Sequence, residues 1–364
     1  MRITFVISSM ECGGAQRVVA DMANYWAERG WYISIVTLTG DAAPDFYELH
    51  SSVERIYLDR MGVTRGYLQK ISSNLITLYK LRRSLSSGHV DVVISFMDVI
   101  NVLTLLASFG LSPRVVISER TDLTTSPEIL PVWRFLRRCV YSWADVIVGQ
   151  TVAAKKLLEL HYAGRTATIP NSLRPLPLPD CMRQSTVLSV GRLVHSKGFD
   201  VLFDAFAQIK DCYPEWRLII LGEGPERGRL LDRARALGIY DRLSMPGLVI
   251  NPERWMAEAG IVVQASRYEG FPNVVLEAMA MGAAVISSDC PSGPADLIQD
   301  GINGRLVAVD DTPGLADAMI ALISDADMRN RMGSAAMYVR SSFAQQEVMS
   351  RWEQVLAFNH SDNS

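Results

Sequence analysis

The sequence of 364 residues is poor in cysteine and has no long apolar run. Its five cysteines are scattered without paired spacing, which argues against a disulfide framework and a zinc site and favours a reducing compartment. No apolar stretch approaches the roughly 20 residues that span a bilayer, and the apolar run after Met1 and Arg2 is too short for a signal peptide. We therefore expect a cytoplasmic protein.

The sequence also lacks a large excess of either positive or negative charge. The 36 Lys and Arg residues nearly balance the 39 Asp and Glu residues, for a formal net charge of −3. Nothing in this balance indicates nucleic-acid binding. No D-x-D pair stands in a loop suited to a metal ion, and no G-x-G-x-x-G follows the first expected strand. We expect neither a metal site nor the usual dinucleotide-binding turn.

What the sequence does contain is a repeated alternation of apolar strands and amphipathic helices, typical of α/β domains. Expected strands of the first half form a parallel sheet of about six or seven strands; they are 3–8, 32–38, 53–58, 92–96, 146–148 and 167–169. The second half repeats the pattern with strands at 187–190, 217–221, near 243, 260–265 and 284–287. Four prolines in the ten residues from Pro170 to Pro179 separate the halves as a stiff linker.

Two carboxylates, Glu269 and Glu277, mark the second half. The strand at 260–265 leads into a turn, and the helix that starts near Pro272 points unpaired N–H groups and its positive dipole end at that turn, an anion site. At a rise of about 1.5 Å per residue the carboxylates would lie roughly 10 to 12 Å apart. Glycosidases that act with retention hold theirs at about 5 to 5.5 Å. We interpret Glu269 and Glu277 as separate hydroxyl-binding groups with phosphate between them.

Cations stand at the end of another strand of the second half. Arg192 and Lys197 frame a turn that leads into a helix, which suits a grip on both oxygens of a leaving diphosphate. His195, in the same turn, is expected to be exposed rather than to touch a ligand. In the first half, the Gly13-Gly14 turn lets backbone approach a diphosphate closely, although such turns more often serve geometry alone.

Two segments of the first half are basic and free of acids. The expected helix 67–85 carries Lys70, Lys80, Arg82 and Arg83, with Ile71, Leu75, Leu78, Leu81 and Leu85 on its packed face. Residues 132–138, followed by Tyr141 and Trp143, alternate arginines with aromatics. One reading is core packing with a solvated basic face. The other, which we favour, is a surface for an anionic membrane or a lipid-linked polyphosphate.

These motifs together resemble the family 4 retaining glycosyltransferases, which have the α/β GT-B fold of two Rossmann-like, doubly wound domains facing a cleft and use nucleotide-diphosphate sugars without a metal or other cofactor. Residues 269–277 resemble the family's E-x7-E motif. The turn with Gly191, Arg192, Leu193, Lys197 and Gly198 resembles its Gly-Arg-Leu and Lys-Gly pair, and residues 13–17 resemble its Gly-Gly-Ala-x-Arg loop.

The resemblance implies roles for these residues. Glu269 would hold hydroxyls of the donor sugar and Glu277 those of the ribose, while Leu248 lies in a loop that meets the nucleobase. Gly13 and Gly14 would face the donor across the cleft. The backbone of the loop and first helical turn would line the sugar and diphosphate, through Gly270, Phe271, Pro272, Asn273, Val274 and Val275. The catalytic set is then Glu269, Arg192 and Lys197, with a UDP-hexose or UDP-N-acetylhexosamine donor favoured.

Segments 95–101, 116–120 and 133–138 look similar to the subgroup that extends glycans on undecaprenyl diphosphate, such as bacterial N-acetylgalactosaminyltransferases. This implies a lipid-linked or polysaccharide acceptor and a place at the inner face of the cell membrane. One departure stands out, because many members carry a histidine where this chain has Arg120, which cannot deprotonate. We assign Arg120 and Asp98, at the ends of neighbouring strands, as acceptor or phosphate contacts rather than catalysts.

The resemblance also implies a domain plan: 1–170 for the acceptor, 171–184 as linker, 185–343 for the nucleotide sugar, and 344–364 as a helix crossing back with a polar tail. Attack would come from the face that the leaving group departs from, so that configuration is retained. Two alternatives stay open. A nucleotide-sugar 2-epimerase would convert the donor without acceptor, and a non-catalytic sugar-nucleotide binding protein would bind it without turnover.

Overall fold

The computed structural model describes residues 1–11, 13–39, 45–58, 67–120, 130–162, 164–179, 181–291 and 293–357, without the side chains of 67–72. Parts of the sequence discussed above therefore lie outside the described residues: one of the five cysteines, Cys12; Asp180 of the expected linker; the side chains of Lys70 and Ile71; and the tail from 358. The chain divides into two compact units, Met1–Pro170 with the residues from Met349 onward, and Asn171–Val348.

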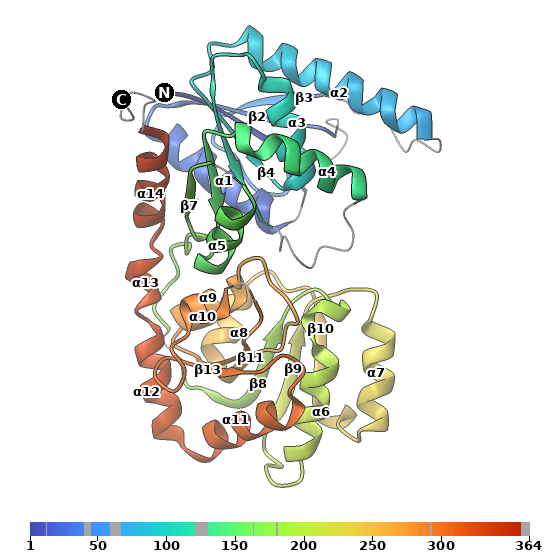
Figure 1. Ribbon diagram of the computed structural model, residues 1–364. Helices are drawn as coiled ribbons and strands as arrows, with labels where there is room; N and C mark the ends of the chain where they lie inside the picture. Colours follow the sequence, from blue (N-terminus) through green and yellow to red (C-terminus); the bar gives the residue numbers. More distant parts are fainter. Residues whose placement is uncertain are drawn as a thin grey trace. The chain divides into compact units, whose positions relative to one another are not determined.

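The N-terminal unit is built on a seven-stranded parallel sheet in the order β3-β2-β1-β4-β5-β6-β7 (Figure 1). Its strands are β1 Arg2–Ile7, β2 Tyr32–Thr37, β3 Glu54–Tyr57, β4 Val92–Phe96, β5 Arg114–Ser118, β6 Val146–Gly149 and β7 Thr166–Thr168. Central strands such as β4 are buried along their whole length, as their continuous apolar sequence requires of a sheet covered on both faces. The expected parallel sheet is confirmed.

Helices cover both faces of this sheet: α1 Gly14–Ala27, α2 Tyr67–Ser87, α3 Asp98–Ser108, α4 Pro131–Val140 and α5 Val152–His161, with the short 3-10 turn η1 Tyr141–Trp143. On one face α3 packs between α2 and α4 (Figure 1). The last helix, α14 Gln345–Ala357, also contributes, because Trp352 lies against Phe96 with ring centroids 6.5 Å apart. Trp26 Nε1 donates to Glu353 Oε1 at 3.0 Å.

The C-terminal unit has a six-stranded parallel sheet in the order β10-β9-β8-β11-β12-β13. Its strands are β8 Gln184–Val190, β9 Arg217–Leu221, β10 Leu243–Gly247, β11 Ala259–Gln264, β12 Ala284–Ser288 and β13 Arg305–Val307. Its helices are η2 His195–Lys197, α6 Phe199–Ile209, α7 Arg227–Ala236, η3 Tyr240–Arg242, α8 Pro252–Glu258, α9 Asn273–Ala280, α10 Pro294–Leu297, α11 Thr312–Ser324, α12 Ala326–Ala336 and α13 Val339–Ser342. Both units therefore have the Rossmann-like, parallel α/β architecture.

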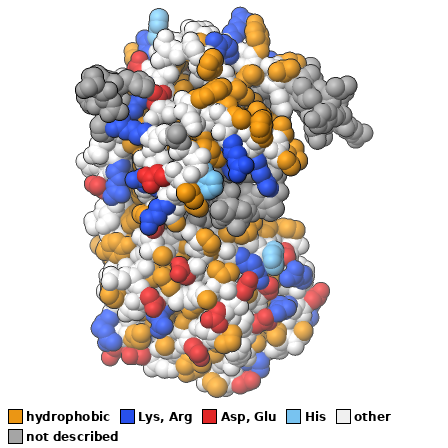
Figure 2. Space-filling model, viewed as in Figure 1, with side chains coloured by type: hydrophobic (Ala, Val, Ile, Leu, Met, Phe, Trp, Pro, Cys, Tyr) orange, Lys and Arg blue, Asp and Glu red, His pale blue; other side chains and the backbone are white. Residues whose placement is uncertain are grey.

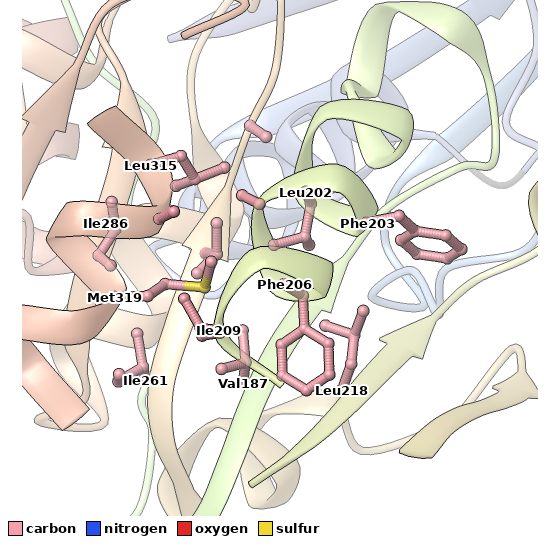
Figure 3. Packing of buried hydrophobic residues seen from close by; sticks show 14 of the residues in the cluster. Val187, Leu202, Phe203, Phe206, Ile209, Leu218, Ile261, Ile286, Leu315 and Met319 are labelled. Carbon is pink, nitrogen blue, oxygen red and sulfur yellow. The ribbon is translucent and has the colours of Figure 1, made fainter. Parts of the chain in front are cut away.

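The core of the C-terminal unit fixes the strand ends that carry the candidate site. On one face of the sheet, Leu202 and Phe206 of α6 lie between Val187 of β8 and Met319 of α11, and all four are 0% exposed (Figure 3). On the other face, α9 buries Val275 at 0% exposure, together with Leu276 and Met279. Because both faces are closed, the loops that leave β8 and β11 start from fixed points.

The structure corrects the expected face of α2. Leu75, expected to be packed, is 61% exposed, whereas Leu81 and Leu85 are buried as expected. The buried stripe continues through Thr77 and Ser73, which lie one and two turns before Leu81. Leu75 is two residues before Thr77 and so points away from this stripe.

The expected linker belongs to the second unit. Leu173 is buried, and its N–H donates to Phe343 O at 2.7 Å. Arg340 donates to the carbonyl oxygens of Leu176 and Pro177. The proline-rich stretch is thus bound to the second unit at Leu173, Leu176 and Pro177, and β8 begins at Gln184.

Candidate functional site

Sheet topology places the candidate residues at one edge of the C-terminal sheet. The strand order reverses between β8 and β11, which are neighbours although they lie far apart in the sequence. In doubly wound sheets, the crevice beyond the carboxyl ends of such strands binds ligands. The loop after β8 carries Arg192 and Lys197, and the loop after β11 carries Glu269.

Lys197 and Glu269 come together as the sequence predicted for neighbouring strand ends. Lys197 Nζ lies 2.6 Å from Glu269 Oε1. The same oxygen accepts hydrogen bonds from Gln264 Nε2 at 2.7 Å and from Ser266 Oγ at 2.6 Å. Three donors on Oε1 hold the carboxylate in one orientation. No donor among the described residues binds its other oxygen, Oε2, which is therefore available to a ligand hydroxyl.

Gln264 and Ser266 were missed by the sequence reasoning. They are buried, at 3% and 0% exposure, and lie at the end of β11 and just beyond it. The signal that could have found them is a pair of polar residues at the end of a buried strand, a few residues before the candidate carboxylate, because buried polar groups need a partner.

Arg192 lies apart from this cluster. Its side chain is exposed, and it forms no ion pair in the part of the chain that the structure describes. Arg192 is thus a free cation at the end of β8, whereas Lys197 is already engaged by Glu269. His195 is exposed, as the sequence analysis expected.

The start of α9 offers a ligand its backbone N–H groups and the partly exposed side chain of Asn273. Phe271 is 6% exposed and Val275 is fully buried, so both side chains belong to the core. Pro272 is the N-cap, and Asn273 Oδ1 accepts a hydrogen bond from Asn171 Nδ2 at 2.8 Å. The N–H of Asn273 already donates to Phe271 O at 2.9 Å, which leaves the N–H groups of Val274 and Val275 for a ligand. Glu277 lies one turn further on and is partly buried.

Three further residues were predicted to contact the donor: Leu248, Gly13 and Gly14. Leu248, just after β10, is 81% exposed. Gly13 is the N-cap of α1, and its N–H and carbonyl oxygen both contact the hydroxyl of Tyr47, at 3.3 and 3.0 Å. Gly14, the first residue of α1, is exposed.

In the N-terminal unit, Arg120 follows β5 directly. Its guanidinium lies over the ring of Phe96, 4.8 Å from the centroid, and its backbone N–H donates to Glu119 Oε1 at 3.0 Å. Burial lowers the pKa of Arg120 to about 9, against the opposing effect of the Glu119 charge. Arg120 therefore remains a cation at neutral pH.

A buried hydrogen-bond network supports this corner. Tyr141 OH donates to Glu119 Oε2 at 2.7 Å, and Asn101 Nδ2 contacts Tyr141 OH at 3.3 Å. Ser95 Oγ donates to Asn101 Oδ1 at 2.8 Å. Burial and the Glu119 charge raise the pKa of Tyr141 well above its usual value, so the phenol stays protonated and acts as a donor.

Two members of the expected basic aromatic surface are instead buried. Arg137 is 8% exposed and pairs with Asp98 at 3.3 Å, and Tyr141 is 0% exposed. A carboxylate as buried as Asp98, at 6%, requires a compensating cation. Arg137 supplies it, so Asp98 is engaged at the first turn of α3 rather than open to the crevice.

Within the described ranges, no three His, Cys, Asp or Glu side chains come together as a metal ion would require. None of the helices that the structure describes is both long and apolar enough to cross a membrane.

Two family models divide the chain between them. Residues 12–175 match the family model Glycosyltransferase Family 4, and residues 181–337 match Glycosyl transferases group 1. With two Rossmann-like sheets and polar residues at their switch points, the fold defines a GT-B glycosyltransferase. The chain belongs to the family 4 glycosyltransferases and is an enzyme of that class.

Relatives of known name agree with this assignment. The chain is 28% identical to a Campylobacter jejuni α-1,4-N-acetyl-D-galactosaminyltransferase that is named for an undecaprenol-diphosphate-linked glycan, over 98% of each chain. It is 25% identical to a second C. jejuni N-acetylgalactosaminyltransferase, covering 90% of this chain and 92% of the other. The fold matches Anabaena HepE in complex with UDP and glucose, with a TM-score of 0.83 and 20% identity over 98% and 99% of the chains. These matches give no support to the epimerase alternative.

Proposed function

We propose that this glycosyltransferase moves a hexose or N-acetylhexosamine from a UDP-sugar to a glycan carried on undecaprenyl diphosphate, with retention of configuration and without a metal ion. The observation that carries the proposal is the cluster at the end of β11, where Lys197 Nζ and two buried polar groups converge on Glu269 Oε1. The names of the C. jejuni relatives support a lipid-linked acceptor. A polysaccharide acceptor is the alternative, because an Erwinia amylovora relative, 23% identical, is named for amylovoran biosynthesis.

The chemistry follows from the charges. The bond between the anomeric carbon and the diphosphate oxygen breaks, and its electron pair stays on that oxygen. Arg192, Lys197 and the first-turn amides of α9 stabilise this growing charge, which is the task a divalent cation performs in metal-dependent enzymes. The acceptor oxygen bonds to the anomeric carbon, and its proton passes to the departing phosphate oxygen.

Glu269 has a separate task. Its Oε1 is held by Gln264 and Ser266 whether or not Lys197 is present. Lys197 can thus turn toward the diphosphate while the carboxylate keeps its orientation. Oε2 then binds a sugar hydroxyl and faces the positive charge that develops on the ring. Glu277 and Leu248 serve the ribose and the nucleobase.

In the N-terminal unit, Arg120 is the acceptor contact. Its guanidinium lies over the Phe96 ring, and its backbone N–H is held by Glu119, which in turn accepts from Tyr141. Such a cation suits an anionic group of the acceptor, and a lipid-linked glycan carries a diphosphate. Asp98 acts indirectly, by holding Arg137.

The membrane contact is a surface on α2, α4 and the adjoining turns, which we call the apolar-basic face. Figure 2 shows hydrophobic side chains gathered on the N-terminal unit with Lys and Arg beside them. Its exposed apolar residues are Leu75, Ile76, Tyr79, Leu130, Val132, Phe135 and Trp143, and its exposed basic residues are Arg83, Arg134 and Arg138. Neither helix contains an acid. This combination fits anionic lipid at the inner face of the membrane.

The experiment that tests the reaction is incubation of the purified protein with UDP- and GDP-sugars and undecaprenyl-diphosphate glycans in EDTA, read by mass spectrometry. We expect one added sugar on the lipid-linked glycan and release of UDP. Conversion of the donor without acceptor would favour an epimerase. Donor binding without turnover on any acceptor would favour a binding protein.

A further inference from the structure

Arg267 joins three loops at the carboxyl edge of the C-terminal sheet. Its Nη1 and Nη2 donate to the two carboxylate oxygens of Asp200 at 3.0 and 2.9 Å. Its Nε lies 2.9 Å from Asp310 Oδ1, and Nη1 also donates to His195 O at 2.6 Å. Asp200 belongs to the first turn of α6, His195 to η2, and Asp310 to the segment before α11. One side chain thus holds the loop after β11 to the other two.

This contact is well suited to hold a fixed geometry. The side chains of Arg267 and Asp200 are 17% and 16% exposed, and two parallel hydrogen bonds define both distance and orientation. Asp310 has a left-handed backbone conformation, with φ of 61°, which residues with a Cβ rarely adopt. The ion pair with Arg267 compensates for this unfavourable backbone conformation.

The backbone reinforces the same junction around Lys197. Arg267 N–H donates to Ser196 O at 2.8 Å, immediately before Lys197. Immediately after it, Gly198 has φ of 63°, and a Cβ there would lie 1.9 Å from Ala265 O. Lys197 is therefore placed between two residues that are pressed against the end of β11. Its Nζ therefore reaches Glu269 from a backbone that is held against the end of β11 on both sides of Lys197.

We propose that Arg267 is a positioning residue, which together with Asp200 and Asp310 sets the loop of Lys197 for its contact with the donor diphosphate. The inference rests on the proposed role of Lys197 in donor binding and catalysis. Arg267 itself acts through Lys197, because both of its carboxylate partners and its carbonyl partner already occupy its guanidinium.

The test is a double-mutant cycle in the full chain, with kcat and donor KM measured at saturating acceptor. Arg267→Ala should lower kcat/KM about 10²-fold, because misplacement of a catalytic group by about 1 Å costs that much. Lys197→Ala should lower it by a similar factor or more. The double variant should be no slower than Lys197→Ala to within about threefold, because the two residues then act through one contact. Arg267→Lys, which keeps one bond to Asp200, should restore part of the loss.

Arg233→Ala is the matched control. Arg233 pairs with Asp204, which lies one turn after Asp200 on α6, and its side-chain hydrogen bonds go to Asp204 rather than to a loop of the site. The Arg233→Ala variant removes an Arg–Asp pair from the same helix and should leave kcat/KM within about twofold of the wild-type value. Where Arg267→Ala does not fold, Asp200→Asn probes the same contact, because an amide keeps one acceptor oxygen and loses the charge.

The outcomes separate the inference from the proposed function. If Lys197→Ala and Glu269→Ala keep wild-type turnover, the proposed site is wrong and the role of Arg267 fails with it. If those two variants lose turnover but Arg267→Ala stays within threefold of wild type, only the positioning role is overturned. Losses that multiply in the double variant also overturn it, because they show that Arg267 acts independently of Lys197.

Discussion

At the scale of single residues, the Glu269 carboxylate is held on one oxygen by three donors and offers the other. Glu269→Ala and Lys197→Ala should each lower kcat by about 10²-fold or more, because each removes a charge that acts on the transition state. Steady-state kinetics at saturating donor measures the loss, and circular dichroism checks that the fold is intact. Wild-type kcat in both variants would refute the assignment.

The Asp200 and Arg267 pair predicts a pH dependence of stability. Burial acts to raise the pKa of Asp200, but hydrogen bonds and charge from Arg267 outweigh it, so that the pKa lies below its ordinary 3.8. The pair therefore stabilises the fold fully above the unfolded pKa, from about pH 5 upward, and the stabilisation is lost as pH falls through the folded pKa, below 3.8. Asp200→Asn should have a lower Tm than wild type at pH 7, and the gap should close below pH 3.8. An equal gap at all pH values would contradict this.

Arg120 predicts a pH dependence of acceptor binding. With a pKa of about 9 it is charged throughout the neutral range. Arg120→His would titrate near or below about 6.5, because the same burial disfavours its cation. We expect the variant to raise acceptor KM by about tenfold or more at pH 7.5 and to recover part of the loss toward pH 6. Wild-type KM should stay flat over this range, and an unchanged variant KM would argue against Arg120 as an acceptor contact.

The sequence predicts the surroundings of some site residues correctly and of others wrongly. Glu269 and Lys197 are recognisable because the motif places them at strand ends, where parallel topology brings them together. Arg137 and Tyr141 were misread as surface residues, because the local sequence around them is basic and free of acids. Their partners, Asp98 and Glu119, lie 39 and 22 positions away. Only the packing of α4 and η1 against the ends of β4 and β5 makes those pairs.

At the scale of elements, the sequence identifies α2 as a helix but not its buried face. Ser73 and Thr77 are buried, and Thr77 Oγ1 satisfies its hydrogen bond within the helix at Ser73 O, 2.8 Å away. Small polar residues whose side chains hydrogen-bond to the backbone of their own helix can be buried. The spacing of the leucines alone therefore predicts the wrong buried face and places Leu75 on it. The exposed Leu75 then becomes part of the apolar-basic face.

The apolar-basic face makes a prediction for α2 and α4 together. Arg83→Glu with Arg138→Glu should lower binding to vesicles of anionic phospholipid about tenfold or more, because each basic residue near the surface contributes about 1 kcal/mol. Co-sedimentation measures it. The control is Arg235→Glu, an exposed charge reversal on α7 of the C-terminal unit, which should leave binding unchanged. Equal binding of neutral and anionic vesicles by wild type would contradict the role of the arginines.

The packing of helix α6 predicts how a core substitution changes the stability of the C-terminal unit. Phe206 is fully buried and packs against the face formed by β8 and β9, beside Val187 and Leu218 (Figure 3). Phe206→Ala should lower the free energy of unfolding by about 3 to 5 kcal/mol, from lost burial and the cavity left behind. Denaturant unfolding measures the change. A loss below about 1 kcal/mol would show that this side of the sheet repacks.

At the scale of the whole molecule, the alternation of strands and helices was enough to predict two parallel sheets. A helix between two strands of one sheet returns the chain to the edge where the first strand began, so the second strand runs parallel to the first. Elements without a strong apolar signal were missed, such as the three-residue strand β13. The division of labour between the units, acceptor on one and donor on the other, remains a proposal. It is the C-terminal unit whose contacts carry the account of the chemistry.

The measurement that tests this account most directly is a crystal structure with UDP bound, grown with magnesium present. We predict phosphate oxygens within about 3 Å of Lys197 Nζ and of first-turn amides of α9, with Arg192 turned toward them and no ion in between. Phosphates bound by magnesium, or held away from both Lys197 and the start of α9, would contradict the claim that fixed cations and amides of this unit receive the leaving group.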